Sequence, residues 1–482
     1  MPYATQHGTF ELASRTGHRN AAVRAIAERR TFHVPAEEIP DLGAIKQRVR
    51  PRSDFPVPSD ADRLKAVLAI DGSRDVERVR DGLPSVMYGF AQTAAAYLDL
   101  AAMESQRTVR FVDPKVLHEA VNTALVSFDL PVSGAYERAG LSIAESWREA
   151  TCRIFRTKKV QVNNLDLSLL DLLLLLHGKP GAPATTLPVN CHDDDCDLED
   201  TPVPAVCADP APGDPDGPPT GLACPGCGGR LLPTDVLRIH EEVIEEGSNE
   251  SALGRLMSVA ELLVLVGLAE LLFSQHRAEL LPQTLFIVDG PLAMYGPPAK
   301  LRGRALGFFQ AMVQQVAGPG PYIVGVEKSG ATVDYADALV RNGVLEPGDV
   351  LVLDEHILSQ LTNTKFVSAY GKETYWGRKF IYRNLDGKVL VPTVMPPMDP
   401  PYDSHGGQPD PAAYPTLPAI LDVFDRTGSS MYRNGIIPVA LAHAGAAFPI
   451  GVGSDVLKLV ATHILGLNNP APASATAASS TP

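Results

Sequence analysis

The sequence has little that would place the chain in a membrane or a secretory pathway. Its most apolar run, residues 165–176, carries Asp166 and Asp171. This run is shorter than the roughly 20 apolar residues that a membrane-spanning helix needs. The first 30 residues are mixed and charged, with no apolar segment of the kind found in signal peptides. We therefore expect a cytoplasmic protein with no role in a membrane.

Several common functional motifs are also missing. The sequence contains no P-loop, no G-x-G-x-x-G after a strand and no G-x-S-x-G, so it supports neither the common nucleotide-binding sites nor a serine hydrolase. Positive charge is outweighed as well: 42 Lys and Arg against 56 Asp and Glu give a net charge of −14. Such a chain repels nucleic acid overall, so binding DNA or RNA would need a local basic surface or a basic partner. One candidate is the second half of a helix predicted within residues 135–159, although a charged helix face is usually only solvated. Its basic residues are Arg148, Arg153, Arg156, Lys158 and Lys159.

Cysteine is scarce, but four of the six cysteines form two close pairs: Cys191, Cys196, Cys224 and Cys227. In the cytoplasm such cysteines are thiols or metal ligands more often than disulfides. Two pairs of thiolates are the donor set of a tetrahedral structural Zn²⁺ site. Cys207 and His192 compete for a ligand position. With four protein ligands, the zinc would stabilise the segment around it and take no part in catalysis.

Two stretches combine a β-rich apolar run with the dipeptide Asp-Gly. Residues 65–70 lead to Asp71, and residues 284–288 lead to Asp289. We predict two strands that each end at Asp-Gly and bring the two carboxylates together at one edge of a sheet. Two hard oxygen ligands in this position suit Mg²⁺ or Mn²⁺. The alternative is that each Asp-Gly is only a turn.

Four further residues are candidates for the same site. Glu261 and Glu270 lie in a strongly apolar predicted helix, where a buried carboxylate is costly unless it is paired or binds a cation. Either could be a third metal ligand, or both could face solvent. His443, in an apolar helix, could bind the metal or carry a proton, or could be an ordinary core residue. Lys328, after a strand, could neutralise a phosphate or be a surface lysine.

Short motifs spread along the chain resemble, in the right order, those of the NurA nuclease family. They are Ile70–Arg74, Arg255–Met257 ahead of Glu261, Val288–Leu292, Gly325–Lys328 and Ala442–His443. The resemblance covers most of residues 60–465. It implies an RNase H-like core with Mn²⁺-dependent 5′–3′ exonuclease and single-strand endonuclease activity. It also implies a homodimer that works with a HerA-type hexameric ATPase that pumps DNA.

The resemblance also assigns roles to individual residues. Asp71 and Asp289 resemble the two metal-binding aspartates of the family. Glu261 resembles its helical glutamate through the Arg-Leu-Met context, with Glu270 in reserve, and His443 resembles its C-terminal histidine.

The sequence departs from the family pattern at two places. The family has a tyrosine, followed by proline, shortly before the histidine; here Ile437 precedes Pro438, and the nearest tyrosine is Tyr432. The cysteine-containing segment is not a feature of the better-known archaeal members. We treat this segment as an insertion.

We therefore predict an α/β protein with an RNase H-like core, a mixed β-sheet flanked by helices, and a zinc-ribbon-like insertion. The expected segments are an N-terminal segment (1–60), the first part of the core (61–184), the insertion (185–235), the second part of the core (236–467) and a disordered tail (468–482).

The predicted function is metal-dependent hydrolysis of DNA, with Mn²⁺ or Mg²⁺, in DNA end processing for repair or in defence. One alternative is a catalytically silent subunit that binds DNA and caps a DNA-translocating ATPase. Another is a hydrolase of small phosphate esters, which would have a closed pocket in place of an open groove. A nuclease requires Asp71 and Asp289 to lie within roughly 4–6 Å of each other, close enough to share a metal.

Overall fold

The computed structural model describes most of the chain. The described residues are 42–82, 85–106, 124–162, 165–193, 195–274, 278–316, 318–354, 357–358, 361, 374–396, 413–428, 436–447 and 452–467. Most of the predicted N-terminal segment, the predicted tail and Tyr432 lie outside them. The chain divides into two units, Met1–Gln47 and Arg48–Pro482. In the first unit the described residues belong to helix α2 (Leu42–Arg48).

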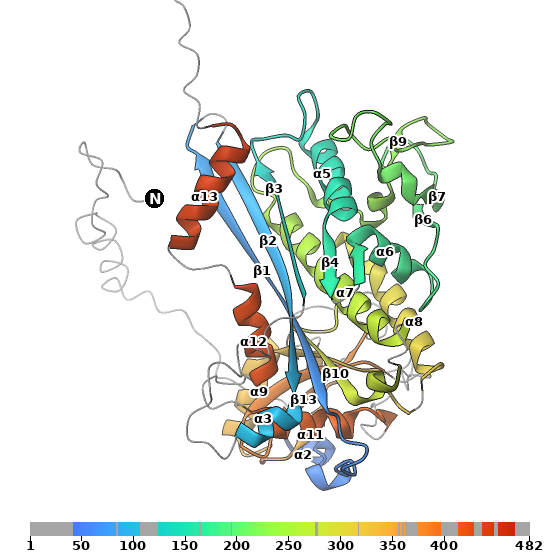
Figure 1. Ribbon diagram of the computed structural model, residues 1–482. Coiled ribbons are helices and arrows are strands. Elements are labelled where there is room, and N and C mark those ends of the chain that lie inside the picture. The colour runs from blue at the N-terminus through green and yellow to red at the C-terminus, as the bar shows by residue number, and fades with distance from the viewer. Residues whose placement is uncertain are drawn as a thin grey trace, which may run out of the picture. The chain divides into compact units, whose positions relative to one another are not determined.

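The second unit is built on an eight-stranded mixed sheet (Figure 1). Its strands lie in the order β12-β13-β14-β11-β10-β1-β2-β3. Strands β1, β2 and β3 are antiparallel, and β10 and β11 follow parallel to β1. This arrangement confirms the predicted mixed sheet of an RNase H-like core. The bounds are β1 (Ala66–Arg80), β2 (Val86–Asp99), β3 (Ala124–Ser133), β10 (Thr284–Asp289), β11 (Tyr322–Glu327), β12 (Val350–Val352), β13 (Arg378–Arg383) and β14 (Val389–Val394).

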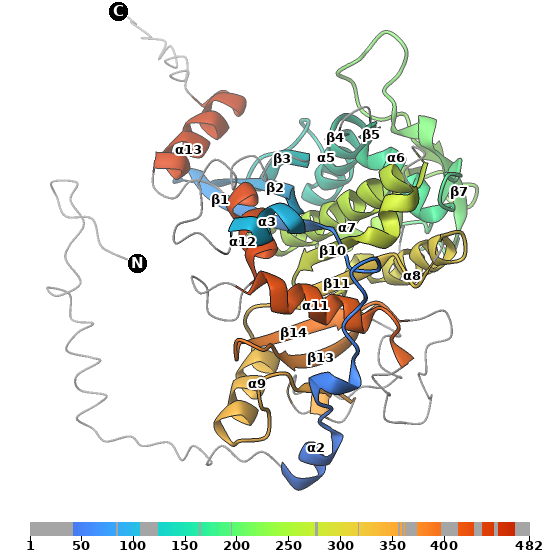
Figure 2. The ribbon, with the colours of Figure 1, turned by 60° about the horizontal axis from the view of Figure 1, so that its bottom comes forward.

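Helices cover both faces of this sheet. Figure 2 shows α7 on one side of β1 and β2, and α12 on the other. The bounds are α3 (Leu100–Gln106), α5 (Ile143–Thr157), α6 (Leu169–His177), α7 (Glu250–Ser274), α8 (Leu301–Val313), α9 (Ala331–Arg341), α11 (Leu417–Thr427), α12 (Ile437–Ala446) and α13 (Val452–Ile464). The apolar run at 165–176 is a short strand, β5 (Leu165–Ser168), followed by α6, where Ser168 and Asp171 form a capping box.

The side chains of β1 alternate between two hydrophobic cores, as the two-residue period of a strand requires. Leu68 and Ile70 pack into the core that contains α7, whereas Val67 and Ala69 pack into the core that contains α11 and α12. By the same alternation, the next residue, Asp71, faces the side of α12, and Gly72 faces α7. The carboxylate and the glycine of the Asp-Gly dipeptide therefore lie on opposite faces of one strand.

Strand β1 does not end at its Asp-Gly dipeptide, so this part of the prediction was wrong. The strand continues to Arg80 because β2 remains its partner, with Asp71 opposite Ala94 and Gly72 opposite Thr93. Only residues 66–70 of β1 pair with β10, which ends at Asp289 as predicted. The 15 residues of β1 span about 50 Å, so β1 and β2 extend well beyond the end of β10.

Helix α7 is the most apolar long helix among the described residues. It is long and apolar enough to cross a membrane by length and composition alone, but 72% of its apolar window is buried inside the protein. It contacts β1, β2 and α6. A helix that is apolar on nearly all sides is typical of a buried core position.

The zinc-ribbon-like insertion is attached to the core through a buried ion pair. The guanidinium of Arg148, on α5, binds both carboxylate oxygens of Asp235, at 3.0 and 2.6 Å, and each side chain is 1% exposed. Arg148 also donates to the carbonyl oxygen of Arg230 in the insertion. These contacts join α5 to the chain that follows the last of the four cysteines.

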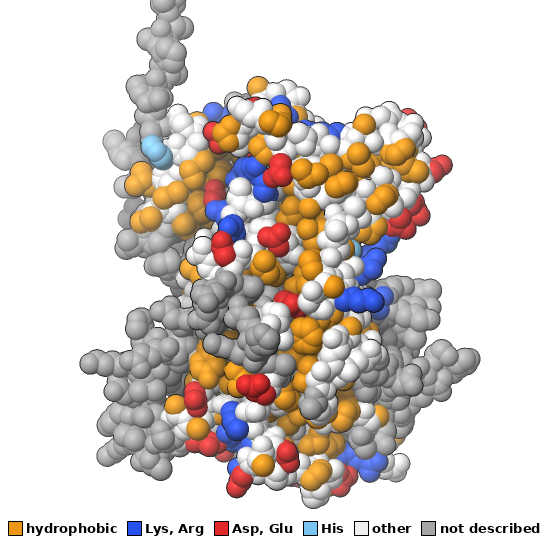
Figure 3. All heavy atoms as spheres, turned by 45° about the vertical axis from the view of Figure 1, so that its right-hand side comes forward, with side chains coloured by type: hydrophobic (Ala, Val, Ile, Leu, Met, Phe, Trp, Pro, Cys, Tyr) orange, Lys and Arg blue, Asp and Glu red, His pale blue; other side chains and the backbone are white. Residues whose placement is uncertain are grey.

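The predicted basic surface on α5 is therefore wrong for Arg148, which is buried. Arg153 is partly exposed but pairs with Glu137 at 2.8 Å. The sequence could not distinguish these cases, because Asp235, the buried partner of Arg148, lies 87 residues away. Figure 3 shows acidic and basic side chains interspersed with hydrophobic ones on one face of the protein.

We expect Arg148→Ala to lower the free energy of unfolding by about 3–5 kcal/mol, because it leaves the Asp235 carboxylate buried without a counter-charge. Urea denaturation measures this loss. Arg153→Ala is the matched control: its pair is partly exposed, and its loss should stay below about 1 kcal/mol. Equal, small losses for the two variants would contradict the anchoring role of Arg148.

Candidate functional site

The candidate site lies where β1 and β10 stop pairing. The last parallel pair is Ile70 opposite Val288, and the next residue of each strand is an aspartate. Asp71 is held by the continuing β1–β2 pairing, while Asp289 is the last residue of β10. Parallel strands in register place these two side chains on the same face. The predicted convergence of the two carboxylates is present in the structure.

A histidine and a lysine contact the two aspartates from other elements. His443, in the last turn of α12, lies with its Nδ1 atom 2.8 Å from Oδ2 of Asp71. Lys328, just after β11, donates from Nζ to Oδ2 of Asp289 at 2.7 Å. Asp71, Asp289 and His443 offer ligand atoms that all lie within 4.8 Å of one another. Asp71 is buried, whereas the His443 side chain is 61% exposed, so the group opens to solvent on the side of α12.

The electrostatics of Asp71 reflect crowding of like charge. Burial and the nearby charge of Asp289 raise the pKa of Asp71 to about 6, against the opposing effects of the His443 hydrogen bond and the charge of Lys328. Carboxylates gathered in this way favour a bound cation or proton. Oxygen and imidazole donors are those that Mn²⁺ accepts, and the oxygens also suit Mg²⁺.

Glu261 approaches the same place from the opposite face of the sheet. Its carboxylate accepts the backbone N–H of Gly72. A Cβ atom at residue 72 would lie only 2.2 Å from Oε1 of Glu261, so any residue other than glycine would displace this carboxylate. Burial and, to a smaller extent, the charges of Asp71 and Asp289 raise the pKa of Glu261 to about 8. Asp71 of the dipeptide thus places its carboxylate on one face of the sheet, and Gly72 leaves space for the Glu261 carboxylate on the opposite face.

Glu270, the alternative to Glu261 as the third metal ligand, lies in a different part of the protein. It lies about 13 Å further along α7, at 1.5 Å per residue, and accepts the backbone N–H of Gly181 at 3.0 Å. It therefore stabilises the turn that follows α6. Of Glu261 and Glu270, only Glu261 reaches the aspartates.

A buried ion pair next to Lys328 was not predicted. Lys379 of β13 is buried and contacts Glu327 at 2.7 Å. Its Nζ atom also lies 4.9 Å from the ring centre of Tyr375, whose hydroxyl bonds that of Tyr295 at 3.1 Å. Lysine is seldom buried, so its residue type alone indicated a surface position. These contacts fix the end of β11, and with it the position of Lys328.

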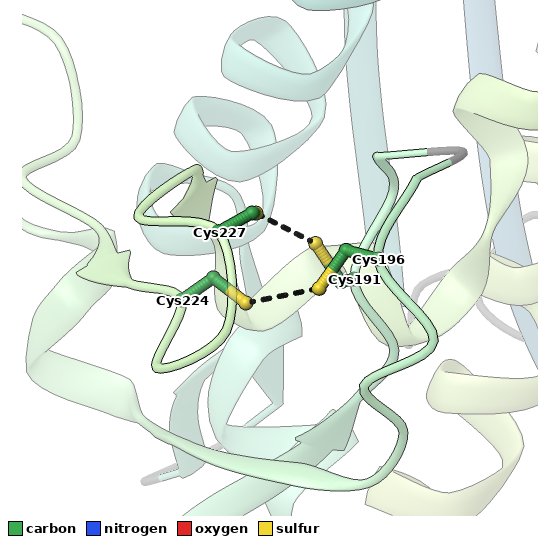
Figure 4. A group of neighbouring side chains, drawn as sticks. All are labelled: Cys191, Cys196, Cys224 and Cys227. Atoms are coloured by element: carbon green, nitrogen blue, oxygen red, sulfur yellow. Dashed lines mark hydrogen bonds between the residues drawn. The ribbon is translucent and has the colours of Figure 1, made fainter.

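The second candidate metal site is the cysteine cluster (Figure 4). Two hairpins contribute the four thiols: β6 (Thr186–Val189) with β7 (Thr201–Pro204), and β8 (Leu222–Ala223) with β9 (Arg230–Leu231). Sγ of Cys191 lies 3.6 Å from that of Cys227, and Sγ of Cys196 lies 3.8 Å from that of Cys224. Four sulfurs at about 2.3 Å from a tetrahedral zinc are about 3.8 Å apart, so the spacing fits Zn²⁺.

The competing zinc ligands do not belong to this cluster. The four Sγ atoms within 4.8 Å of one another are those of the two predicted pairs. His192 instead lies with Nε2 2.9 Å from Nη1 of Arg148, and Cys207 is buried in the small hydrophobic core of the insertion. The backbone N–H of Cys227 lowers the pKa of Cys224 to about 7, which favours the thiolate that zinc requires.

Comparisons with known proteins add distant structural matches. No protein-family model and no curated protein matches this chain. Among solved structures, it is similar to the NurA nuclease from Sulfolobus solfataricus at 11% identity and a TM-score of 0.34, covering 95% of this chain and 97% of that one. It is also similar to a structure of NurA with manganese, at 12% identity and a TM-score of 0.28, covering 95% and 98%.

A structure of NurA bound to dAMP and manganese matches at 11% identity and a TM-score of 0.28, covering 91% of this chain and 95% of that one. The matched structures are of the family whose motifs the sequence resembles. Identities this low do not transfer residue roles, which therefore rest on the geometry of this site.

We expect the purified protein to contain about one zinc ion per chain, bound by the four cysteines. Cys224→Ser should lose this zinc, because it replaces a thiolate with a hydroxyl that stays protonated. Cys207→Ser should retain it. Metal analysis by mass spectrometry after removal of loosely bound ions measures the content. Unchanged zinc in Cys224→Ser would refute the site.

Because the pKa of Glu261 is raised, we expect the free energy of unfolding of the metal-free protein to depend on pH. Between its ordinary pKa of 4.5 and about 8, the folded state keeps a proton on Glu261 that the unfolded state releases. The free energy of unfolding should therefore fall as pH rises through this window. Glu261→Gln should flatten the fall above pH 6, and only the smaller contribution of Asp71, between 3.8 and about 6, should remain. Urea denaturation from pH 4.5 to 8.5 tests this, and identical slopes for the two proteins would contradict it.

Proposed function

We propose that this chain is a divalent-metal-dependent nuclease that hydrolyses DNA phosphodiester bonds. The observation that carries the proposal is the convergence of Asp71, Asp289 and His443, whose ligand atoms lie within 4.8 Å of one another. Two carboxylates this close can share a metal, which is what separates a nuclease from a silent binding subunit. The group also opens to solvent through the exposed His443, as a polymeric substrate requires.

The donor set suits Mn²⁺ or Mg²⁺. Asp71 and Asp289 would hold the ion, with His443 as a further ligand and Glu261 completing the site from the face of α7. When bound, such an ion stabilises negative charge on the phosphate and lowers the pKa of water. The four cysteines of the insertion would hold a structural Zn²⁺ at a separate site.

The residues of the site have distinct roles in this proposal. Lys328, which now neutralises Asp289, can turn its ammonium to a substrate phosphate once a cation takes over that task. His443 can accept or deliver a proton at the solvent side of Asp71. Glu261, with a pKa near 8, can release its proton when a cation binds.

The finer assignments rest on the resemblance of the sequence motifs. We propose 5′–3′ exonuclease and single-strand endonuclease activity, a cytoplasmic homodimer, and action with a HerA-type ATPase in DNA end processing for repair or in defence. The net charge of −14 supports a partner, because the chain alone repels DNA. We also propose that residues 185–235 form an insertion between the two parts of the core.

The test is cleavage of labelled single- and double-stranded linear DNA with Mn²⁺, Mg²⁺ or a chelator. We expect metal-dependent cleavage that falls at least about 100-fold in Asp71→Asn and in Asp289→Asn, because a lost metal contribution of several kcal/mol corresponds to at least that factor. Asp75→Asn is the matched control: it makes the same change on β1, about 13 Å beyond Asp71, and should retain activity.

Circular dichroism and urea denaturation of each variant separate loss of chemistry from loss of fold. Activity that survives both Asp71→Asn and Asp289→Asn would rule out this site. No cleavage by the wild type, even with a HerA-type ATPase added, would favour the silent subunit. Labels at the 5′ or the 3′ end report the direction of digestion.

A further inference from the structure

A cavity outside the metal centre lies among α6, α8 and the zinc-ribbon-like insertion. It has a volume of about 80 Å³. Since a water-sized site occupies about 10–15 Å³ by this measure, the cavity has room for about five to eight atoms, enough for a phosphate group. The polar residues that line it are His177, Asn190, Asp200, Arg238, Lys300 and Arg304.

The charge of this lining is positive in a protein that is acidic overall. Arg238 pairs with Glu241 through two hydrogen bonds of 2.6 and 2.8 Å. Lys300 and Arg304, at the start of α8, are exposed and have no ion-pair partner among the described residues. The only carboxylate of the lining is Asp200. Two cations without partners, one turn apart, repel each other unless an anion binds between them.

The backbone at the cavity supports a built site. Asp200 and Arg238 have φ angles of 50° and 58°, and they are the non-glycine residues with positive φ in the described part of the chain. Such conformations are rare outside glycine, and they concentrate at functional sites. Both residues line this one cavity. The N–H of Asp200 donates to Oδ1 of Asn190 at 3.1 Å, which leaves the amide nitrogen of Asn190 as a further donor.

His177 adds an acceptor to the same lining. Its Nδ1 atom lies 2.9 Å from the carbonyl oxygen of Leu173, which assigns the ring proton to Nδ1. Burial lowers the pKa of His177 to about 4, and the nearby charge of Arg304 contributes to the fall. The ring is therefore neutral at pH 7, and Nε2 is free to accept a hydrogen bond from a hydroxyl group. Cations and an acceptor together suit a terminal phosphate, whose monoanion carries one hydroxyl.

We propose that this cavity binds a phosphate group through Lys300 and Arg304, with Asn190 and Arg238 completing the donor set. The phosphate belongs either to a DNA strand or to a small phosphorylated molecule. The site lies apart from Asp71 and Asp289, so the proposal does not depend on the nuclease activity. It assigns a function to the junction between the insertion and the core.

The first test is calorimetric titration with inorganic phosphate, at constant ionic strength and without added divalent metal. We expect saturable binding by the wild type, at least about tenfold weaker binding by the double variant Lys300→Ala/Arg304→Ala, and tighter binding by Asp200→Asn, which removes the opposing charge. Asparagine also tolerates the left-handed backbone at residue 200. Arg78→Ala, which removes an exposed arginine elsewhere, is the control and should bind like the wild type.

The second test identifies the source of the phosphate. Fluorescence anisotropy with a 5′-phosphorylated single-stranded oligonucleotide measures affinity as a function of salt. Weaker binding and a smaller salt dependence in the double variant would assign the site to DNA, because each lost phosphate contact reduces the slope by about 0.7 on single strands. Unchanged oligonucleotide binding with lost phosphate binding would assign it to a small phosphorylated molecule. No saturable phosphate binding by the wild type, or equal binding by the double variant, would overturn the proposal.

Discussion

Repulsion between like charges is the constraint on which this structure depends. The carboxylates of Asp71, Asp289 and Glu261 are brought together where β1 leaves β10, and two of them have raised pKa values because they are buried near one another. The protein offsets this cost with Lys328 on Asp289 and His443 on Asp71. Each of these residues comes from a different element, so the sheet, α7 and α12 must all be in place before the site exists. A fold that holds carboxylates in this way gains stability when a cation binds.

The chain contains two sets of metal-ligand side chains with opposite chemical preferences. Four thiols on two hairpins fit a closed tetrahedral site for a soft ion, whereas carboxylates and an imidazole where β1 and β10 stop pairing fit a harder one. The two are built on different scaffolds, and the buried pair of Arg148 and Asp235 joins the hairpins to the core. The insertion is therefore held by ionic contacts to the core as well as by its own cysteines. Its removal would leave a buried charge on α5 without its partner.

The features of the fold and the site that could be predicted are those marked by short patterns in the sequence. The four cysteines and the two Asp-Gly dipeptides are local patterns, and each marked a place where the structure gathers ligand atoms. The continuation of β1 past Gly72 was missed because the pairing that extends it comes from β2. The burial of Arg148 was missed for a similar reason, since Asp235, its buried acidic partner, is 87 residues away. A charged residue whose partner is remote in the sequence is predicted to be exposed, and only the fold shows whether it is buried.

Gly72 limits how this chain can vary. Every other amino acid carries a Cβ atom, and at this position that atom would take the space of a Glu261 carboxylate oxygen. The strand conformation itself would accept most residues, so the restriction comes from the neighbouring helix and not from the backbone. A larger residue at position 72 therefore displaces the Glu261 carboxylate from its place beside the aspartates. Diverging sequences that keep this carboxylate in place should keep glycine at position 72.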